Sequence, residues 1–380
     1  MKLTEVCDFQ GGSQPPKEEW SFECHDGYIR MLQIRDFTQS ERVTPEYIKI
    51  RGNIKTCTTD DILIARYGAS LGKILTGLAG AYNVALMRTI PNEKFLRKKY
   101  LYYYLQSPFF QNCILNVGSR AAQAGFNKDD LSEIEIQCPA LVVQDRIIKQ
   151  MENLDTIIKY RKEELSKLDT LVKSRFIEMF GDPVMNPMGW RKSTVGAECY
   201  YIKDGPHKSP PYVTEDEGIP FISTRNIVNG AGIDWSTAKY ISEEDYIKCI
   251  KKCHPQKGDI LYSKGGTTGI AKLVDTDRKF ANWVHVAVLK FHDNLDGRFF
   301  ESMLNTDYCY DQSQRLTKGI VNKDFVLSAI AQVKIFVPPI NLQREYKSFV
   351  ELADKSKSIL QKLLEKQELL RAALMQEYFG

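Results

Sequence analysis

The sequence lacks the features that mark several large classes of protein. No segment approaches the roughly 18 consecutive apolar residues of a membrane-spanning helix, and the first residues, MKLTEVCDFQ, contain no apolar run suited to a signal peptide. The nine cysteines are an odd number without regular spacing, which favours reduced thiols over a disulfide framework. We therefore predict a cytoplasmic protein and set aside secreted, collagen-like and membrane proteins.

A strong charge imbalance is also lacking. The chain of 380 residues has 52 Lys and Arg against 48 Asp and Glu, a net charge of +4. Composition alone therefore gives no electrostatic argument for nucleic acid, although basic side chains could still gather on one face after folding. With 43% hydrophobic and 26% charged residues, the length suits two or three packed domains.

Familiar catalytic and metal-binding motifs are missing. The sequence has neither the G-x-x-x-x-G-K-[ST] phosphate loop nor the H-E-x-x-H zinc motif. Gly265–Gly269 looks like a phosphate cradle but follows no dinucleotide-binding pattern, so we interpret it as a tight turn. Cys249, Cys253 and His254 could supply three zinc ligands, yet no second metal-spaced pair follows. We assign no catalytic residue and no metal site, which disfavours an enzyme with its own active site.

An internal repeat organises the chain. Asp61-Ile62-Leu63 followed by Gly68 recurs as Asp259-Ile260-Leu261 followed by Gly266. Three further matches keep the same order: Asn127-Lys128-Asp129 with Asn322-Lys323-Asp324, Pro139 and Gln144 with Pro338 and Gln343, and Phe180-Gly181 with Phe379-Gly380. Several matches in one order are not expected by chance, so the sequence predicts two similar halves.

Each half begins with about 140 residues of short strands and glycine-bearing turns, which predict an α+β domain. The predicted strands are Tyr28–Ile34, Ile62–Ala65, Val84–Arg88, Ile219–Ser223, Ile260–Tyr262 and Val284–Phe291, and the predicted helices cover 98–116 and 296–312. Tyr102, Tyr103 and Tyr104 could stack on bases, although a face turned to the core is the better interpretation.

Each half ends in a predicted long helix, over 141–179 and 342–378. Apolar residues recur at spacings of three, four and seven, which indicates that the helices pack on each other as a coiled coil; packing of each helix on its own domain is the alternative. The predicted packing residues are Leu154, Ile158, Leu165, Leu168, Val172, Leu360, Leu363, Leu370 and Leu374.

The chain resembles the specificity (S) subunit of Type I restriction–modification enzymes over essentially its full length. The resemblance rests on the duplicated Asp-Ile-Leu motif with its glycine loop, on the Pro-x-x-x-x-Gln helix starts, and on the endings Phe176–Gly181 and Met375–Gly380. Asn186–Trp190 is similar to the family's entrance to the second recognition domain.

The resemblance implies an α+β fold with two target-recognition domains, over 1–138 and 183–338, and two antiparallel spacer helices, over 139–182 and 339–380. It implies a non-catalytic subunit that binds double-stranded DNA, two adenine-N6 methyltransferase (M) subunits and restriction (R) subunits. Each domain would read one half of a split asymmetric target, and the helices would set the spacing. No cofactor is expected on this chain; S-adenosylmethionine would belong to the M subunits, and ATP and Mg to the R subunits.

Candidate DNA contacts are polar and basic residues in loops beside glycines, since Arg, Lys, Asn and Gln read base edges and Ser and Thr hold phosphates. They are Arg35, Arg66, Ser70, Lys73, Arg120, Gln123, Lys128, Arg225, Asn226, Lys264, Thr267, Thr268, Arg315, Lys318 and Lys323. Lys128 and Lys323 occupy equivalent repeat positions, which suits a shared phosphate contact. A solvated surface charge is the alternative for each residue.

Two other functions stay open at this point. One is a self-contained DNA methyltransferase or nuclease, which would bind S-adenosylmethionine in this chain. The other is a coiled-coil adaptor that binds no DNA.

Overall fold

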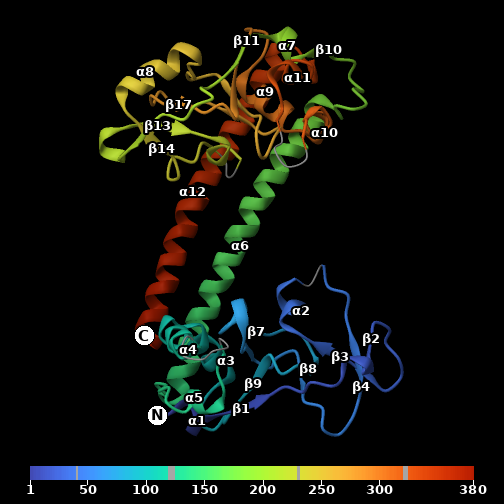
Figure 1. Ribbon diagram of the computed structural model, residues 1–380, viewed down its shortest axis with the longest axis vertical. Coiled ribbons are helices and arrows are strands. Elements are labelled where there is room, and N and C mark those ends of the chain that lie inside the picture. The colour runs from blue at the N-terminus through green and yellow to red at the C-terminus, as the bar shows by residue number, and fades with distance from the viewer. Residues whose placement is uncertain (40–41, 119–124, 229–231, 320–323) are drawn as a thin grey trace. The chain divides into compact units, whose positions relative to one another are not determined.

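The structure is a computed structural model that describes residues 1–39, 42–118, 125–228, 232–319 and 324–380. The chain divides into two compact units. Unit 1 consists of Met1–Lys162 and Leu363–Gly380, and unit 2 consists of Glu163–Lys362. Each unit contains an α+β part, called module 1 (residues 1–140) or module 2 (residues 181–339), together with segments of two long helices (Figure 1).

Module 1 contains two sheets and five helices among its described residues. Its strands are β1 (Cys7–Gly11), β2 (Trp20–Ser21), β3 (Tyr28–Leu32), β4 (Tyr47–Lys49), β5 (Thr56–Cys57), β6 (Leu63–Ala65), β7 (Ile74–Leu75), β8 (Gly80–Tyr82) and β9 (Leu86–Pro91). Its helices are α1 (Leu3–Val6), α2 (Ile34–Thr38), α3 (Lys98–Gln106), α4 (Pro108–Gly118) and α5 (Lys128–Leu131). The strand orders are β1-β9-β6-β7 and β2-β4-β3-β8-β5.

Module 2 has the same plan. Its strands are β10 (Arg191–Thr194), β11 (Cys199–Asp204), β12 (Tyr212–Val213), β13 (Ile219–Ile222), β14 (Lys239–Ile241), β15 (Ile260–Ser263), β16 (Ala271–Leu273), β17 (Ala281–Asn282), β18 (Val286–Phe291) and β19 (Lys334–Val337). Its helices are α7 (Val195–Glu198), α8 (Glu243–Lys252), α9 (Gly297–Leu304), α10 (Asp307–Leu316) and α11 (Leu327–Ile330). The orders are β11-β18-β15-β16, β12-β14-β13-β17 and β10-β19.

The two modules share the order of one four-stranded sheet and of four strands of the second sheet, including the register of one strand pair, whereas β5 in module 1 and the β10-β19 sheet in module 2 have no counterpart among the described strands. In module 1, β3 lies parallel to β8 with Leu32 opposite Tyr82. In module 2, β13 lies parallel to β17 with Ile222 opposite Asn282. The neighbouring pairs in both modules are antiparallel, apart from these two. The predicted internal repeat and α+β class are confirmed.

The predicted strands are present, with ends that differ by a few residues, but the helices predicted over 98–116 and 296–312 are each two helices. In module 1, Ser107 separates α3 from α4, because the residue before a proline, here Pro108, is driven out of the helical conformation. In module 2, Thr306 starts α10, and its hydroxyl accepts a hydrogen bond from the N–H of Cys309.

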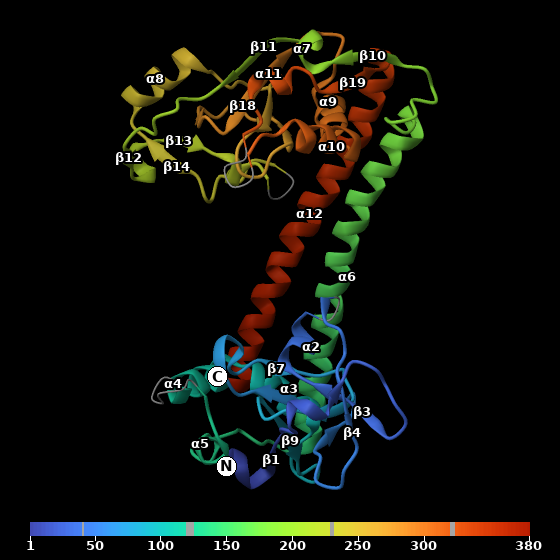
Figure 2. The same ribbon diagram turned by 45° about the vertical axis from the view of Figure 1, so that its right-hand side comes forward.

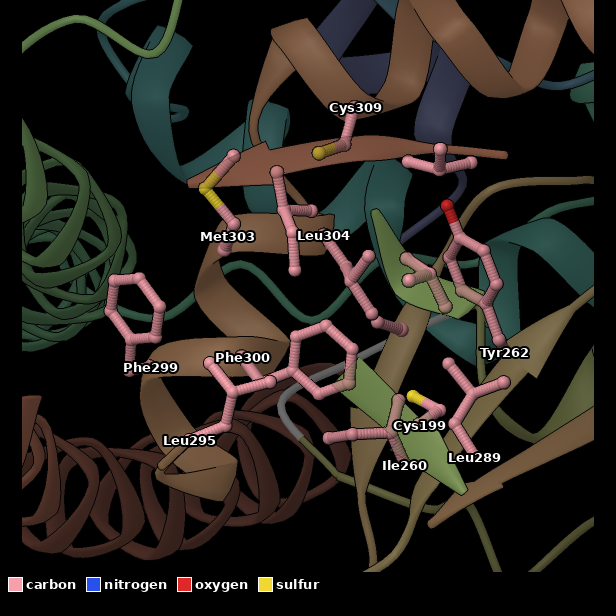
Figure 3. Packing of buried hydrophobic residues seen from close by; sticks show 14 of the residues in the cluster. Cys199, Ile260, Tyr262, Leu289, Leu295, Phe299, Phe300, Met303, Leu304 and Cys309 are labelled. Carbon is pink, nitrogen blue, oxygen red and sulfur yellow. The ribbon is translucent and has the colours of Figure 1, made fainter. Parts of the chain in front are cut away.

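Aromatic residues fill the core between the sheets and the helices. In module 1, Tyr103 and Tyr104 are buried on α3, which favours the interpretation of the tyrosine run as a core face. In module 2, Phe300 of α9 lies between the helix and the sheet and meets Phe291 of β18 edge to face, whereas Phe299 packs on Phe176 and Phe180 of α6 (Figure 3). The apolar residues of α9 recur at three and four positions, which places them on one side of the helix.

The two long helices are α6 (Leu141–Phe180) and α12 (Ile340–Phe379). Within each unit they lie side by side and run antiparallel (Figures 1 and 2). In unit 1, Asp155 of α6 pairs with Arg371 of α12 at 2.6 Å. In unit 2, Asp169 pairs with Lys357 at 2.7 Å. The predicted antiparallel pairing is confirmed.

The leucines chosen for the helix interface are only partly correct. Leu154 and Ile158 are buried, but Leu363 and Leu370 are 37% and 51% exposed. The less exposed positions of this part of α12 are Leu364, Gln367 and Arg371. The prediction chose interface residues by the spacing of leucines. The residues of α12 that face α6 include polar side chains, which the spacing of apolar residues does not reveal. Leu165, Leu168, Val172, Leu360 and Leu374 are half-buried.

Each long helix ends in a core of the unit that contains its last turns. Phe176 and Phe180 of α6 are buried in unit 2, and Met375 and Phe379 of α12 are buried in unit 1. Gly181 follows α6 with a positive φ of 78° and its N–H bonds the carbonyl of Ile177, which ends the helix. Among the described helices, none is long and apolar enough to cross a membrane.

Candidate nucleic-acid interface

The repeated Asp-Ile-Leu motif is a structural element. Asp61 is 4% exposed and its carboxylate pairs with Arg88 at 3.0 Å. Asp259 is 7% exposed and pairs with Lys290. In both modules the aspartate precedes a central strand and binds a cation on the neighbouring strand. The repeat at this position therefore reflects packing within each module.

The repeated glutamine fixes the start of each long helix. Gln144 is fully buried, and its Oε1 accepts a hydrogen bond from the N–H of Arg97 at 2.9 Å. Its Nε2 donates to the carbonyls of Phe95 at 2.7 Å and Pro139 at 2.8 Å. Gln343 makes the same set of bonds, from the N–H of Asp296 and to the carbonyls of Asn294 and Pro338. Each amide ties a helix start to the loop that precedes α3 or α9.

The predicted equivalence of Lys128 with Lys323 is wrong. Tyr67 forms a β-bridge with Gly125 in module 1, and the corresponding Gly265 bridges Asp324 in module 2. Asn127 caps α5 two residues after Gly125, and Val326 occupies that place before α11. The Asn-Lys-Asp resemblance is therefore out of register, because the preceding segments differ in length. Lys323 itself, like Arg120 and Gln123, lies outside the described residues.

In module 1, the remaining candidates fall into two groups. Arg66 has a structural role, since its Nε donates to the carbonyl of Phe126 at 3.1 Å and its Nη1 to that of Val84 at 3.3 Å. Lys128 is exposed and pairs with Asp8. The others are exposed or half-exposed: Arg35 on α2, which pairs with Glu46, Ser70 at the end of a short 3-10 helix, and Lys73 before β7.

In module 2, three candidates are buried and committed to partners within the module. The amide of Asn226 accepts a hydrogen bond from the N–H of Ser223 at 2.8 Å and donates to the carbonyl of Asp234 at 3.0 Å. Lys264 is 5% exposed and pairs with Asp204 and Asp324. The structure favours a role within the module for Asn226 and Lys264, because a DNA contact by either would leave a buried partner unpaired.

Thr268 is also buried, at 2% exposed, and its hydroxyl lies 3.2 Å from that of Thr317. Its carbonyl accepts a hydrogen bond from Gln314 at 3.1 Å. A role within the module is favoured for Thr268 for the same reason. The pattern that suggested it, a threonine beside glycines, does not distinguish a loop tip from a loop base.

The exposed candidates of module 2 lie on three segments that hydrogen bonds connect to one another or to a shared neighbour. Thr267 belongs to the turn between β15 and β16, as interpreted for Gly265–Gly269, and Arg315 and Lys318 lie at the end of α10 and just beyond it. The hydroxyls of Thr268 and Thr317 connect the two segments. Arg225 is exposed on a short 3-10 helix (Thr224–Asn226), and the hydroxyl of its neighbour Thr224 donates to the carbonyl of His285.

Sequence reasoning missed two residues at this edge. Trp283 and His285 meet edge to face with ring centroids 4.5 Å apart, and Gly265 packs against the imidazole so closely that any Cβ would overlap it. Burial, together with the charge of Lys264, lowers the pKa of His285. The signal for these residues in the sequence is the glycine at position 265, where module 1 has Tyr67. A search for basic residues does not detect it.

A second missed feature is a pair of glycines under the strand crossover. A Cβ on Gly12 would overlap the carbonyl of Asn83, and a Cβ on Gly205 would overlap that of Asn282. Both glycines let the chain that leaves β1 or β11 cross the end of the parallel pair β3–β8 or β13–β17. Cys249 and Cys253 are buried in separate clusters of apolar residues.

Comparison with known proteins gives a consistent result. The family described as Type I restriction modification DNA specificity domain matches residues 1–169 and again residues 202–371. The putative type I restriction enzyme MjaX specificity subunit of Methanocaldococcus jannaschii is 26% identical over 155 residues, which cover 37% of this chain and 36% of that protein. The type I restriction enzyme EcoBI specificity subunit of Escherichia coli is 23% identical over 164 residues, 42% of this chain and 33% of that protein.

These two alignments span about a third of each relative's length. A solved structure described as the basis of complex assembly and conformational transition of the type I R-M system has a TM-score of 0.60 and 18% identity. It covers 100% of this chain and 96% of that chain, so the likeness in fold extends over both modules and both long helices. Because the family matches both halves, and both halves share one topology, the chain belongs to the Type I restriction–modification DNA specificity family and has the fold of its S subunits.

Proposed function

We propose that this chain is the DNA sequence-specificity subunit of a Type I restriction–modification complex in the cytoplasm. In this proposal each module reads one half of a split, asymmetric double-stranded target. The observation that carries the proposal is that the family matches twice, over residues 1–169 and 202–371, on modules of one topology. Two modules with a repeated fold and different exposed loops are suited to recognise two different DNA sequences.

The loops after β6 and β15 differ in sequence. After β6 the chain reads Arg66-Tyr67-Gly68-Ala69-Ser70, and after β15 it reads Lys264-Gly265-Gly266-Thr267-Thr268. The two loops start from equivalent strands. Different side chains present different hydrogen-bond donors and acceptors to the major groove, so the two modules would select different base pairs.

The helices would set the distance between half-sites and dock two M subunits. A helix of 40 residues is about 60 Å long, which exceeds the 34–36 Å between half-sites one turn of DNA apart. Both units expose apolar side chains on these helices, such as Tyr160 in unit 1 and Ile359 in unit 2, with 58% and 61% exposure. In this proposal these side chains belong to the surface that the M subunits cover.

The subunit would act without catalysis of its own. S-adenosylmethionine would then bind the M subunits, and ATP and Mg would act with R subunits. The first test is activity of the purified chain on DNA with S-adenosylmethionine, ATP and Mg. We expect neither methylation nor cleavage until M subunits are added, and then adenine methylation at one sequence.

The outcomes separate the three functions. Robust methylation or cleavage by a preparation free of partner subunits would support the self-contained enzyme. Assembly with M subunits but no sequence-selective binding would support the adaptor. Either result contradicts the proposal.

A further inference from the structure

Arg35 and Arg225 occupy the same position in the two modules. Each follows the strand of the parallel pair that ends at Leu32 or Ile222, and each is the third residue beyond it. The sequence repeat does not reveal this equivalence, because the spacing between the two arginines differs from the spacing between Asp61 and Asp259. The register of the strands establishes it.

The residue after each arginine fixes its backbone. Asp36 and Asn226 are both 2% exposed. The side chain of Asp36 accepts a hydrogen bond from the N–H of Gln33 at 2.8 Å, and that of Asn226 accepts one from the N–H of Ser223 at 2.8 Å. These closed turns hold the arginines at the surface, where both side chains are exposed. Because the backbone at each arginine is fixed, the exposed guanidinium can contact a ligand at a defined position on the module.

In module 2, the loop after β15 lies on the same edge as Arg225, and in module 1 the loop after β6 makes the equivalent backbone contact. The N–H of Arg66 donates to the carbonyl of Ala85 at 2.9 Å, and the N–H of Lys264 donates to that of His285 at 2.9 Å. In module 2, the hydroxyl of Thr224, beside Arg225, donates to the same carbonyl of His285 at 3.0 Å. Arg225, the glycine turn and His285 therefore share one edge of module 2.

The side chains around the two arginines are not shared. Tyr67 corresponds to Gly265, Ala69 to Thr267, and Ala85 to His285. A phosphate is the same at every base pair, whereas base edges differ from one target to another. An arginine that is present at the same position in both modules is therefore suited to bind a phosphate. The side chains that differ between the modules are suited to bind base edges.

We propose that Arg35 and Arg225 are phosphate anchors, one in each module, and that unshared side chains of the equivalent segments, Tyr67 in module 1 and Thr267 and His285 in module 2, read base edges. This inference rests on the proposed DNA-recognition function and assigns roles within it. Glu46, which pairs with Arg35 and accepts a bond from Gln33 at 2.6 Å, orients the guanidinium. The guanidinium has five N–H donors, so this pair leaves donors for a phosphate oxygen.

The test uses the full chain with its M subunits and two duplexes of equal length, one with the mapped target and one with its bases scrambled. Dissociation constants are measured between 50 and 200 mM NaCl. Arg35→Ala and Arg225→Ala should each weaken binding to both duplexes by about tenfold and reduce the salt slope by about 1. The ratio between the duplexes should stay unchanged. Arg35→Lys and Arg225→Lys should restore the slope.

Tyr67→Ala and His285→Ala should do the opposite, lowering the preference for one half-site each while leaving the salt slope unchanged. Arg97→Ala, which removes an exposed arginine paired with Asp145, is the matched control and should change neither quantity. The assignment is overturned if either alanine variant at the anchors keeps the wild-type slope and affinity, or changes the duplex ratio. If the wild type fails to distinguish the duplexes, the proposed function fails, whereas the slopes on scrambled DNA still decide the role of the arginines.

Discussion

Phe176 of α6 stacks on Phe299 of α9, with ring centroids 5.7 Å apart and an angle of 16° between the rings. Phe176 also meets Tyr346 of α12 edge to face at 5.6 Å. The last turns of α6 are therefore part of the core of unit 2, although the first turns of the same helix belong to unit 1. Phe379 of α12 packs on Tyr100 of α3 at 5.0 Å in unit 1, which repeats the arrangement.

This packing predicts a sharp contrast between two neighbouring residues. Phe176→Ala removes a ring that is 3% exposed and should lower the free energy of unfolding of unit 2 by about 4 kcal/mol. Ile177→Ala, at a position 45% exposed, should change it by less than about 1 kcal/mol. Urea unfolding followed by tryptophan fluorescence measures both, because Trp190, Trp235 and Trp283 all lie in unit 2. Equal effects of the two changes would contradict the packing described.

The buried amide at the start of α12 gives a second prediction. Gln343→Leu keeps the approximate volume of the side chain but leaves two carbonyls and one N–H without their partner. We expect a loss of about 3 kcal/mol in the stability of unit 2. Gln361→Leu on the exposed face of the same helix is the control and should have little effect. A Gln343→Leu protein as stable as the wild type would show that these hydrogen bonds do not hold the helix start.

Acid should weaken the start of module 2 through Glu198. Burial raises the pKa of this carboxyl, but hydrogen bonds from Arg191, Ser193 and Asn294 outweigh it and lower the pKa to about 2 from the ordinary value of 4.5. Because the folded value lies below the ordinary one, the stabilisation is complete above pH 4.5 and is lost as the pH falls toward about 2.

Glu198→Gln removes this titration. The difference in unfolding free energy between wild type and variant should therefore shrink as the pH falls from 5 to 2. Glu217→Gln, at an exposed carboxyl, serves as the control. A difference that stays constant over this range would show that Glu198 does not titrate as described.

The sequence was sufficient for the repeat and the α+β class, since these depend on recurring motifs and on short strands between turns. The antiparallel direction of the helices came from the resemblance to the S-subunit family. It was insufficient for the helix interface, where Gln367 and Arg371 lie in the contacting row while Leu363 and Leu370 face solvent. Apolar spacing cannot reveal an interface that uses polar side chains.

The sequence alone could not separate accessible candidate DNA contacts from buried ones, for a physical reason. Residue type identifies side chains able to bind DNA, but burial decides whether they are accessible. Asn226 and Lys264 have side chains of the types that bind DNA, but they form hydrogen bonds and ion pairs with partners inside module 2. The equivalence of Arg35 and Arg225 depends on strand register, which insertions between the motifs hide from the sequence.

The central claim is that two separate modules read two different half-sites. It is tested most directly by single-molecule methylation mapping of cells that express this chain with its M subunits. The comparison is with a chain in which residues 1–138 are replaced by the equivalent domain of a relative.

We expect the wild type to direct methylation to two unlike half-sites around an unread gap, and the replacement to change one half-site while the other half-site and the gap persist. Two separate readers are excluded if the replacement alters both half-sites together, or if the wild type directs methylation to one short continuous palindrome.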